Sequence, residues 1–323
     1  MAASDRRDLL VQFWQDERLS AGIKIEDMLL VAEGLRPASL LIVPVNLPDG
    51  DRIGRDIDRR FYHAWNKGYM PDSPRWSRPL EYVYRRIAGR VVGSIRYRAS
   101  LAREAFRKTV ADSPGYKALV QWSEALGIER LETTVRPTID EVYLSTGAAV
   151  VEGLGEVMGL RYRARQETGD GDKGREALVF RAFPEERDRS FLTTLGRLLG
   201  YPSCCVERYA DERVGGINVE ERAARQLRKA LSRGRVAEHA YYSRDFFPCQ
   251  PDCPRASGKG KAGLRILRRL GEQADLADLG EAYLGLMQDN MNLVKEYPEL
   301  IRSHEKAMKE KRGGGRISRD EHE

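Results

Sequence analysis

The chain lacks the long apolar stretches that membrane insertion requires. Its longest apolar run surrounds LLIVPV at residues 40–45, far short of the roughly 20 residues that span a bilayer. The first ten residues, MAASDRRDLL, mix acidic and basic side chains and contain no apolar signal core. Apolar residues make up 41% of the chain and charged residues 32%. These features predict a soluble globular protein in the cytoplasm.

Side-chain amides are also scarce. The sequence contains five Asn and eight Gln, against 43 Arg and 12 Lys. A low amide content with many charges is typical of thermophile proteins, although hyperthermophiles more often enrich Lys. A GC-rich genome gives the same preference for Arg. A thermophilic source would bear on the chemistry of the cysteines, because the cytosol of hyperthermophiles tolerates disulfides.

With 323 residues the chain can form one large domain or two. Apolar periodicity predicts an α+β protein, with a mixed α/β part at 1–184, a helical module at 185–312 and a disordered tail at 313–323. Strands are expected at 38–46, 130–137, 140–145, 160–166 and 176–183. Helices are expected at 80–110, 116–127, 146–159, 188–199, 204–211, 219–232, 263–274 and 276–311, the last interrupted near Tyr297 and Pro298.

Two familiar cofactor motifs are missing. Gly153, Gly155 and Gly159 follow G-x-G-x-x-x-G, one residue longer than the dinucleotide fingerprint, and they fall inside a predicted helix instead of a strand-to-helix turn. The third cysteine of a radical-SAM motif is absent as well. The sequence therefore favours neither cofactor class, and no catalytic residue is assigned.

The four cysteines form two close pairs. Cys204 and Cys205 are adjacent in GYPSCCVERY, and Cys249 and Cys253 lie in FPCQPDCPRAS. Pro202 suits a helix start, which places the first pair in a first turn, where free N–H groups favour the thiolate. Adjacent helical residues diverge by about 100°, so we expect both thiols to reach one centre only if that turn is distorted. Three prolines stiffen the loop of the second pair.

Three interpretations of these cysteines are open. Four thiolates can hold one zinc ion or an iron–sulfur cluster. The thiols can instead serve redox chemistry or staple a metal-free binding protein through disulfides. In the third interpretation the four cysteines are unconnected structural residues, which their clustering into two pairs makes the weakest of the three. His239 is a possible fifth ligand, and Asp252, between the second pair of thiols, is a candidate ligand or base. Four thiolates favour a structural site, and the alternative is a catalytic site with one cysteine free and His239 or Asp252 taking part.

These motifs resemble those of a known family. LGYPSCCVERY, a histidine and FPCQPDCPRAS, within about residues 187–270, are similar to the uncharacterised, largely archaeal family catalogued as domain of unknown function 483. The resemblance implies that the cysteine module is the family's shared unit, and it implies no activity.

A second candidate region is strongly basic. The net charge is +6, yet residues 75–108 contain ten bases and two acids, so the rest of the chain carries about −2. Arg binds phosphate in a bidentate manner and Tyr stacks on bases, which predicts RNA or another polyanion as partner. The alternative is an amphipathic helix with a solvated cationic face. The candidate nucleic-acid-binding residues are Arg85, Arg86, Arg90, Arg96, Arg103 and Arg107.

Overall fold

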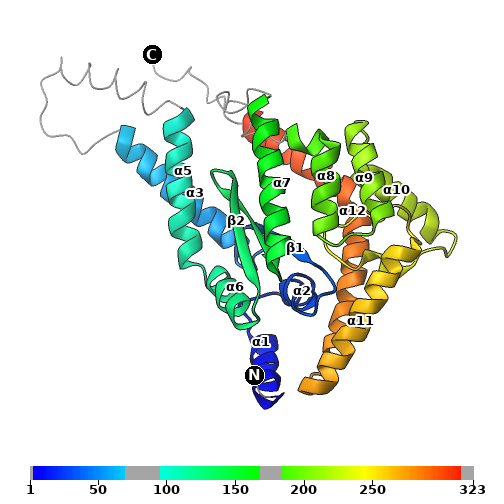
Figure 1. The fold of residues 1–323 in the computed structure, drawn as a ribbon. Coiled ribbons are helices and arrows are strands. Elements are labelled where there is room, and N and C mark those ends of the chain that lie inside the picture. Colours follow the sequence, from blue (N-terminus) through cyan, green and yellow to red (C-terminus); the bar gives the residue numbers. More distant parts are fainter. Residues whose placement is uncertain (1–2, 70–94, 168–183, 314–323) are drawn as a thin grey trace, which may run out of the picture. The chain divides into compact units, whose positions relative to one another are not determined.

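Helices dominate the computed structural model, which describes residues 3–69, 95–167 and 184–313 (Figure 1). In chain order the elements are α1 (Ala3–Gln15), the π-helix η1 (Ile23–Leu29), α2 (Leu30–Ala32), β1 (Ala38–Val43), α3 (Gly50–Tyr69), α5 (Ile95–Asp112), α6 (Pro114–Ala125), β2 (Glu129–Arg136), β3 (Ile139–Ser145), α7 (Ala148–Glu167), η2 (Pro184–Arg187), α8 (Arg189–Leu198), α9 (Ser203–Val214), α10 (Val219–Leu231), η3 (Glu238–Tyr241), α11 (Pro254–Ala274) and α12 (Leu279–Gly313). The α+β class predicted from the sequence is confirmed, and none of the described helices is long and apolar enough to cross a bilayer.

Contacts divide the chain into two compact units. Unit 1 comprises Met1–Tyr201 and Arg269–Leu276, and unit 2 comprises Pro202–Arg268 and Ala277–Glu323. All strands among the described residues belong to unit 1, and all four cysteines belong to unit 2. The domain boundary near residue 184 stays a prediction.

Unit 1 is built on a three-stranded antiparallel sheet in the order β1-β3-β2. Strand alternation sends Tyr143 to one face, where it packs with Ala38, Leu154 and Leu199, so α7 and α8 cover that face. Ser39 points to the other face and donates a hydrogen bond to the Asp27 carbonyl at 2.9 Å, which fixes η1 there. The predicted strands around 38–46, 130–137 and 140–145 are confirmed.

The strand predicted at 160–166 is wrong, because α7 continues to Glu167. Arg161 and Arg165 lie one helical turn apart, and both pair with the buried Glu185 at 3.2 and 2.6 Å. Arg161 also holds Glu141 of β3 at 2.7 Å. The alternation typical of a strand thus places Arg161 and Arg165 on one face of α7, whereas Arg163 is exposed. The strand predicted at 176–183 lies outside the described residues.

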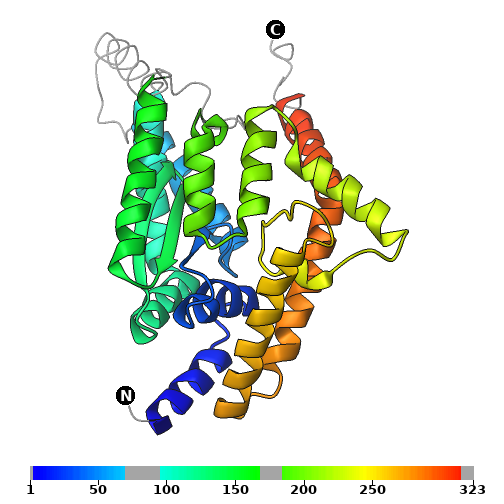
Figure 2. The same ribbon diagram turned by 45° about the vertical axis from the view of Figure 1, so that its right-hand side comes forward.

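Unit 2 is helical in its described part. α12 fixes η3 by two buried bonds, from Tyr283 Oη to the Tyr242 carbonyl and from Asn290 Nδ2 to the Tyr241 carbonyl, both at 3.1 Å. The predicted interruption of the last helix is wrong, since α12 runs through Pro298. Arg228 of α10 donates to the Lys295 carbonyl at 2.8 Å and stabilises α12 beside the proline. Figure 2 shows α11 and α12 side by side, as does Figure 1.

Candidate metal centre

The first cysteine pair lies in the opening turn of α9. Pro202 takes the N-cap position with φ −59° and ψ 133°, and the helix begins at Ser203. Gly200 makes the preceding turn with φ +75°, a conformation that favours glycine. Cys204 and Cys205 therefore occupy the second and third helical positions, and their Sγ atoms lie 3.9 Å apart. The two sulfurs therefore point to a common centre although both residues lie within α9.

The second pair brackets a tight loop that ends in another helix start. The Cys253 N–H donates to the Gln250 carbonyl at 3.0 Å, which closes a turn. The Cys253 carbonyl accepts the N–H of Ser257 at 2.9 Å, the first hydrogen bond of α11. The helix predicted to start at residue 263 thus starts at Pro254. As a result, the N-termini of two helices adjoin the four thiols.

All four sulfurs form one group, whose ligand atoms lie within 4.8 Å of one another. Sγ of Cys204 lies 3.8 Å from Sγ of Cys253 and 3.9 Å from Sγ of Cys249. Sγ of Cys205 lies 3.7 Å from Sγ of Cys253. All four cysteines are free, because these distances far exceed the roughly 2.05 Å of a disulfide bond.

Burial divides the group into an inner and an outer pair. Cys205 and Cys253 are 2% and 0% exposed, whereas Cys204 and Cys249 are half-buried. Sγ of Cys205 also accepts the backbone N–H of Cys249 at 3.4 Å. An N–H donated to sulfur favours the thiolate, the form of cysteine that binds metal.

The thiols have different proton affinities. Burial raises the pKa of Cys205 far above its usual range, and burial raises the pKa of Cys249 to about 11. Burial also acts to raise the pKa of Cys253, but hydrogen bonds from the Ala256 N–H and the other thiols outweigh it and lower the pKa. Four ligands of this kind release protons when they bind a cation.

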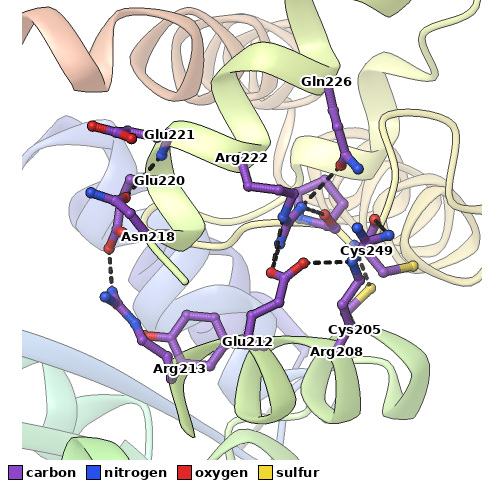
Figure 3. Close-up of polar contacts among 12 residues, drawn as sticks. Cys205, Arg208, Glu212, Arg213, Asn218, Glu220, Glu221, Arg222, Gln226 and Cys249 are labelled. Carbon is purple, nitrogen blue, oxygen red and sulfur yellow. Dashed lines mark hydrogen bonds and ion pairs between the residues drawn. The ribbon is translucent and has the colours of Figure 1, made fainter. Parts of the chain in front are cut away.

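Two arginines hold the loop of the second pair in place (Figure 3). Arg208 of α9 donates to the Cys249 carbonyl at 2.8 Å, and Arg222 of α10 donates to the Pro248 carbonyl at 3.1 Å. Glu212 lies between the two guanidinium groups, 2.8 Å from Arg208 and 2.7 Å from Arg222. Since Arg222 and Glu212 are nearly buried, they form a fixed support for the loop.

The α9–α10 connection is held by its own polar contacts. Arg213 pairs with Glu220, and the Asn218 side chain caps α10 by accepting the Glu221 N–H at 3.0 Å (Figure 3). These contacts orient α10 so that Arg222 reaches the loop. Sequence reasoning missed Arg208, Glu212 and Arg222. The i,i+4 spacing of Arg208 and Glu212 immediately after the first cysteine pair was the available signal.

The group of potential ligands does not include His239 or Asp252. The His239 backbone instead lies against α11, where a Cβ on Gly260 would come within 2.1 Å of the His239 carbonyl oxygen. Asp252 is exposed in the loop between the second pair. The possible role of His239 as a ligand stays a prediction.

The predicted nucleic-acid-binding residues are only partly described. Arg85, Arg86 and Arg90 lie outside the described residues, as does the side chain of Arg96. Arg103 makes a bidentate contact with Asp140 at 2.6 and 2.9 Å, so it is held against β3. Arg107 is exposed on α5. The role of this segment in binding stays a prediction.

Comparison with known families supports the resemblance seen in the sequence. Residues 125–282 match the model of a family described as protein of unknown function (DUF483). The predicted family resemblance is confirmed. The match extends on both sides of the expected residues 187–270, taking in β2, β3 and α7 of unit 1 as well as the four cysteines. A search of curated proteins and a search of solved structures gave no significant match.

Proposed function

We propose that the four cysteines bind a single metal ion, with zinc as the best fit. A Zn–S bond of about 2.3 Å in a regular tetrahedron separates the ligand sulfurs by about 3.8 Å. The closest sulfur pairs in the protein lie 3.7–3.9 Å apart. This agreement is the observation that carries the proposal.

An iron–sulfur cluster is the second cofactor that four cysteines suit. A polynuclear cluster places several iron and sulfide atoms between its ligands, so it holds the thiolates further apart than a single ion does. Four ligand atoms within 4.8 Å of one another favour the single ion. A mononuclear tetrahedral iron site would meet the same geometry, and elemental analysis distinguishes it from zinc.

The proposed centre is structural. Four protein thiolates fill all four positions of a tetrahedral zinc ion and leave none for substrate. One divalent ion with four thiolates carries a net charge of −2, and the N-termini of α9 and α11 stabilise negative charge. The ion would join the start of α9 to the loop before α11, a connection that bridges 49 residues between Cys204 and Cys253.

Elemental analysis of protein purified without oxygen tests this proposal. We expect one zinc per chain, and loss of the metal in the Cys249→Ser, Cys253→Ser double variant. Absence of metal, together with loss of free thiols on purification in air, would contradict the proposal. That outcome would support the alternative of a thiol-redox or disulfide-stapled binding protein.

A polyanionic partner completes the proposal. The charge surplus of residues 75–108 supports binding of RNA, and a role in RNA processing or modification in the cytoplasm. Reversing two charges in this segment, with Arg86→Glu and Arg90→Glu, should abolish salt-dependent RNA binding. Unchanged affinity of this variant would remove the segment from the proposal.

A further inference from the structure

A cationic surface lies on the part of α11 that belongs to unit 2. The stretch from Cys253 to Arg268 contains five bases and no acid. Lys261, Arg265 and Arg268 are all exposed and follow one another at i, i+4 and i+7. At 1.5 Å per residue this spacing sets them on one face over about 10 Å. We call these three residues the α11 stripe.

The carboxylates of the fold do not neutralise the α11 stripe. Among the described residues, neither Lys261 nor Arg265 has a carboxylate within ion-pair distance, and Arg268 reaches only the exposed Glu281 at 3.9 Å. Like charges three and four residues apart destabilise a helix by a few tenths of a kcal/mol per pair. The fold therefore gains no electrostatic stability from gathering these cations, although the side chain of Arg268 also packs against Gly280.

The proposed metal centre does not account for the stripe either. Arg255 follows Cys253 by two residues and donates to the Ser203 hydroxyl at 2.8 Å, so the negative charge of the proposed centre accounts for this base. Lys261 lies eight residues beyond Cys253, about 12 Å along the helix. The screening length at physiological salt is about 8 Å, so the charge of the centre is largely screened at the stripe.

A glycine next to the stripe has no packing role. Gly258 is exposed, and a Cβ added there would meet nothing within 4 Å. Glycine costs about 1 kcal/mol relative to alanine inside a helix. Gly260 differs, since the His239 carbonyl requires it. A bare backbone at Gly258 leaves room for a ligand to approach the helix closely.

We propose that the α11 stripe binds the phosphodiester backbone of a nucleic acid. Three cations over about 10 Å match about three nucleotides of one strand at 3.4 Å per step. The inference goes beyond the metal centre and adds a contact in unit 2 that is separate from residues 75–108. Contacts of this kind position a strand without reading its sequence.

Fluorescence anisotropy with a labelled 20-nucleotide single-stranded RNA tests the proposal, using full-length protein. The Lys261→Gln, Arg265→Gln, Arg268→Gln variant should bind at least about tenfold more weakly near 0.1 M salt. Its salt dependence, the slope of log K against log salt, should fall by about 2. A single-stranded DNA of the same sequence shows which nucleic acid is preferred, and tight binding of either supports the proposal.

A matched control removes the same charge elsewhere in unit 2. Arg225, Arg233 and Arg235 are exposed bases in or just after α10, and their replacement by Gln should change the affinity less than twofold. Equal losses in the two triple variants, or no loss in either, would overturn the proposal. So would a wild-type protein that binds neither RNA nor DNA, or one that binds only vesicles containing anionic phosphatidylglycerol.

Two checks keep the result interpretable. Metal content and circular dichroism of each variant report whether the centre and the fold are intact, and the milder Lys261→Gln, Arg265→Gln variant replaces any triple variant that misfolds. The two proposals can fail independently. Failure of the metal proposal is detected by elemental analysis, whereas failure of the present inference is detected by the binding measurement. RNA binding lost in the Arg86→Glu, Arg90→Glu variant and retained in the α11 variants assigns binding to residues 75–108 alone, and overturns the present inference.

Discussion

Unit 1 and unit 2 hold their segments together by different interactions. In unit 1 the buried Arg161 and the half-buried Arg165 of α7 are neutralised by carboxylates from β3 and η2, and one face of the sheet packs in an apolar cluster. In unit 2 an irregular loop must be held between helices, and four sulfurs gather where that loop meets two helix N-termini. Regular packing and ion pairs suffice where strands supply the framework, whereas the proposed metal ion would cross-link the loop of unit 2 to a distant segment.

The largest expected difference follows removal of the sulfur ligands. In a Cys253→Ser variant we expect unit 2 to lose most of its hydrogen-exchange protection, because structural zinc contributes on the order of 10 kcal/mol to small metal-dependent folds. Protection of β1, β2 and β3 in unit 1 should persist. Hydrogen exchange read by mass spectrometry measures both. Equal protection in variant and wild type throughout α9–α11 would show that the sulfurs do not stabilise unit 2.

Removal of one buried carboxylate from each unit compares the two units in stability and in metal affinity. Glu212→Gln should lower the free energy of unfolding by about 3 kcal/mol, since it leaves Arg222 buried without its ion pair. It should also weaken metal binding, because Arg222 positions the loop. Glu185→Gln in unit 1 should cost a similar amount through Arg161 and Arg165.

Urea denaturation gives the stabilities of these two variants, and a competing chromophoric chelator gives their metal affinities. Only the Glu212 variant should show a weaker metal affinity. A similar drop in metal affinity in both variants would contradict the role of Arg208, Glu212 and Arg222 as supports of the loop.

Two glycines on α11 give a smaller, opposed pair of effects. Gly260→Ala should lower the free energy of unfolding by about 1–3 kcal/mol, because its Cβ would meet the His239 carbonyl at 2.1 Å. Gly258→Ala, two residues earlier, should raise it by about 0.5–1 kcal/mol, since nothing lies near that Cβ. Thermal unfolding followed by circular dichroism compares the two. Shifts of the same sign would contradict this packing of α11 on η3.

The smallest expected effect concerns a single carboxylate of unit 1 and its dependence on pH. In unit 1 the Arg18 side chain, together with the Trp122 N–H, holds the pKa of Asp16 well below its usual range. A depressed folded-state pKa contributes stability above the unfolded value of about 3.9, and this stability is lost as the pH falls through the folded-state pKa. Asp16→Asn should therefore cost about 1 kcal/mol at pH 7 and progressively less below pH 4.

Unit 2 should respond to acid differently, because protonation of the thiolates releases the metal. Its acid transition should move to lower pH when zinc is added, while that of unit 1 should not move. Hydrogen exchange at several pH values reads the two units separately. A zinc-independent acid transition in unit 2 would argue against a metal-linked centre.

Regular elements were the predictable part of the fold. Strand β1 follows from its apolar run, β2 and β3 follow from alternation, and α6 ends where Gly127, with φ +68°, follows it. Errors arose where tertiary contacts override local signals. The glycines of SGKGKAG argue against a helix, yet α11 starts at Pro254, because Cys253 caps it and Gly260 permits close packing. In α7 the contacts of Arg161 and Arg165 with Glu185 likewise override the strand-like alternation of residues 160–166.

The candidate site was predictable in its ligands and unpredictable in its support. Two cysteine pairs in a chain with only four cysteines identify the sulfur group without any structure. Arg222 carries no such signal, and Glu212 has only its i,i+4 spacing from Arg208, which is common on helix surfaces; burial of the Glu212–Arg222 pair is what gives it weight.

Two sulfur pairs, an excess of arginine and enough apolar periodicity for an α+β fold are all readable from the amino-acid sequence. The 3.8 Å separation of sulfurs that lie 49 residues apart is a property of the folded chain alone. Periodicity and spacing report on neighbours within a few residues, because they follow from backbone geometry. Closing a long loop depends on packing summed over the whole unit, which no short stretch of sequence contains.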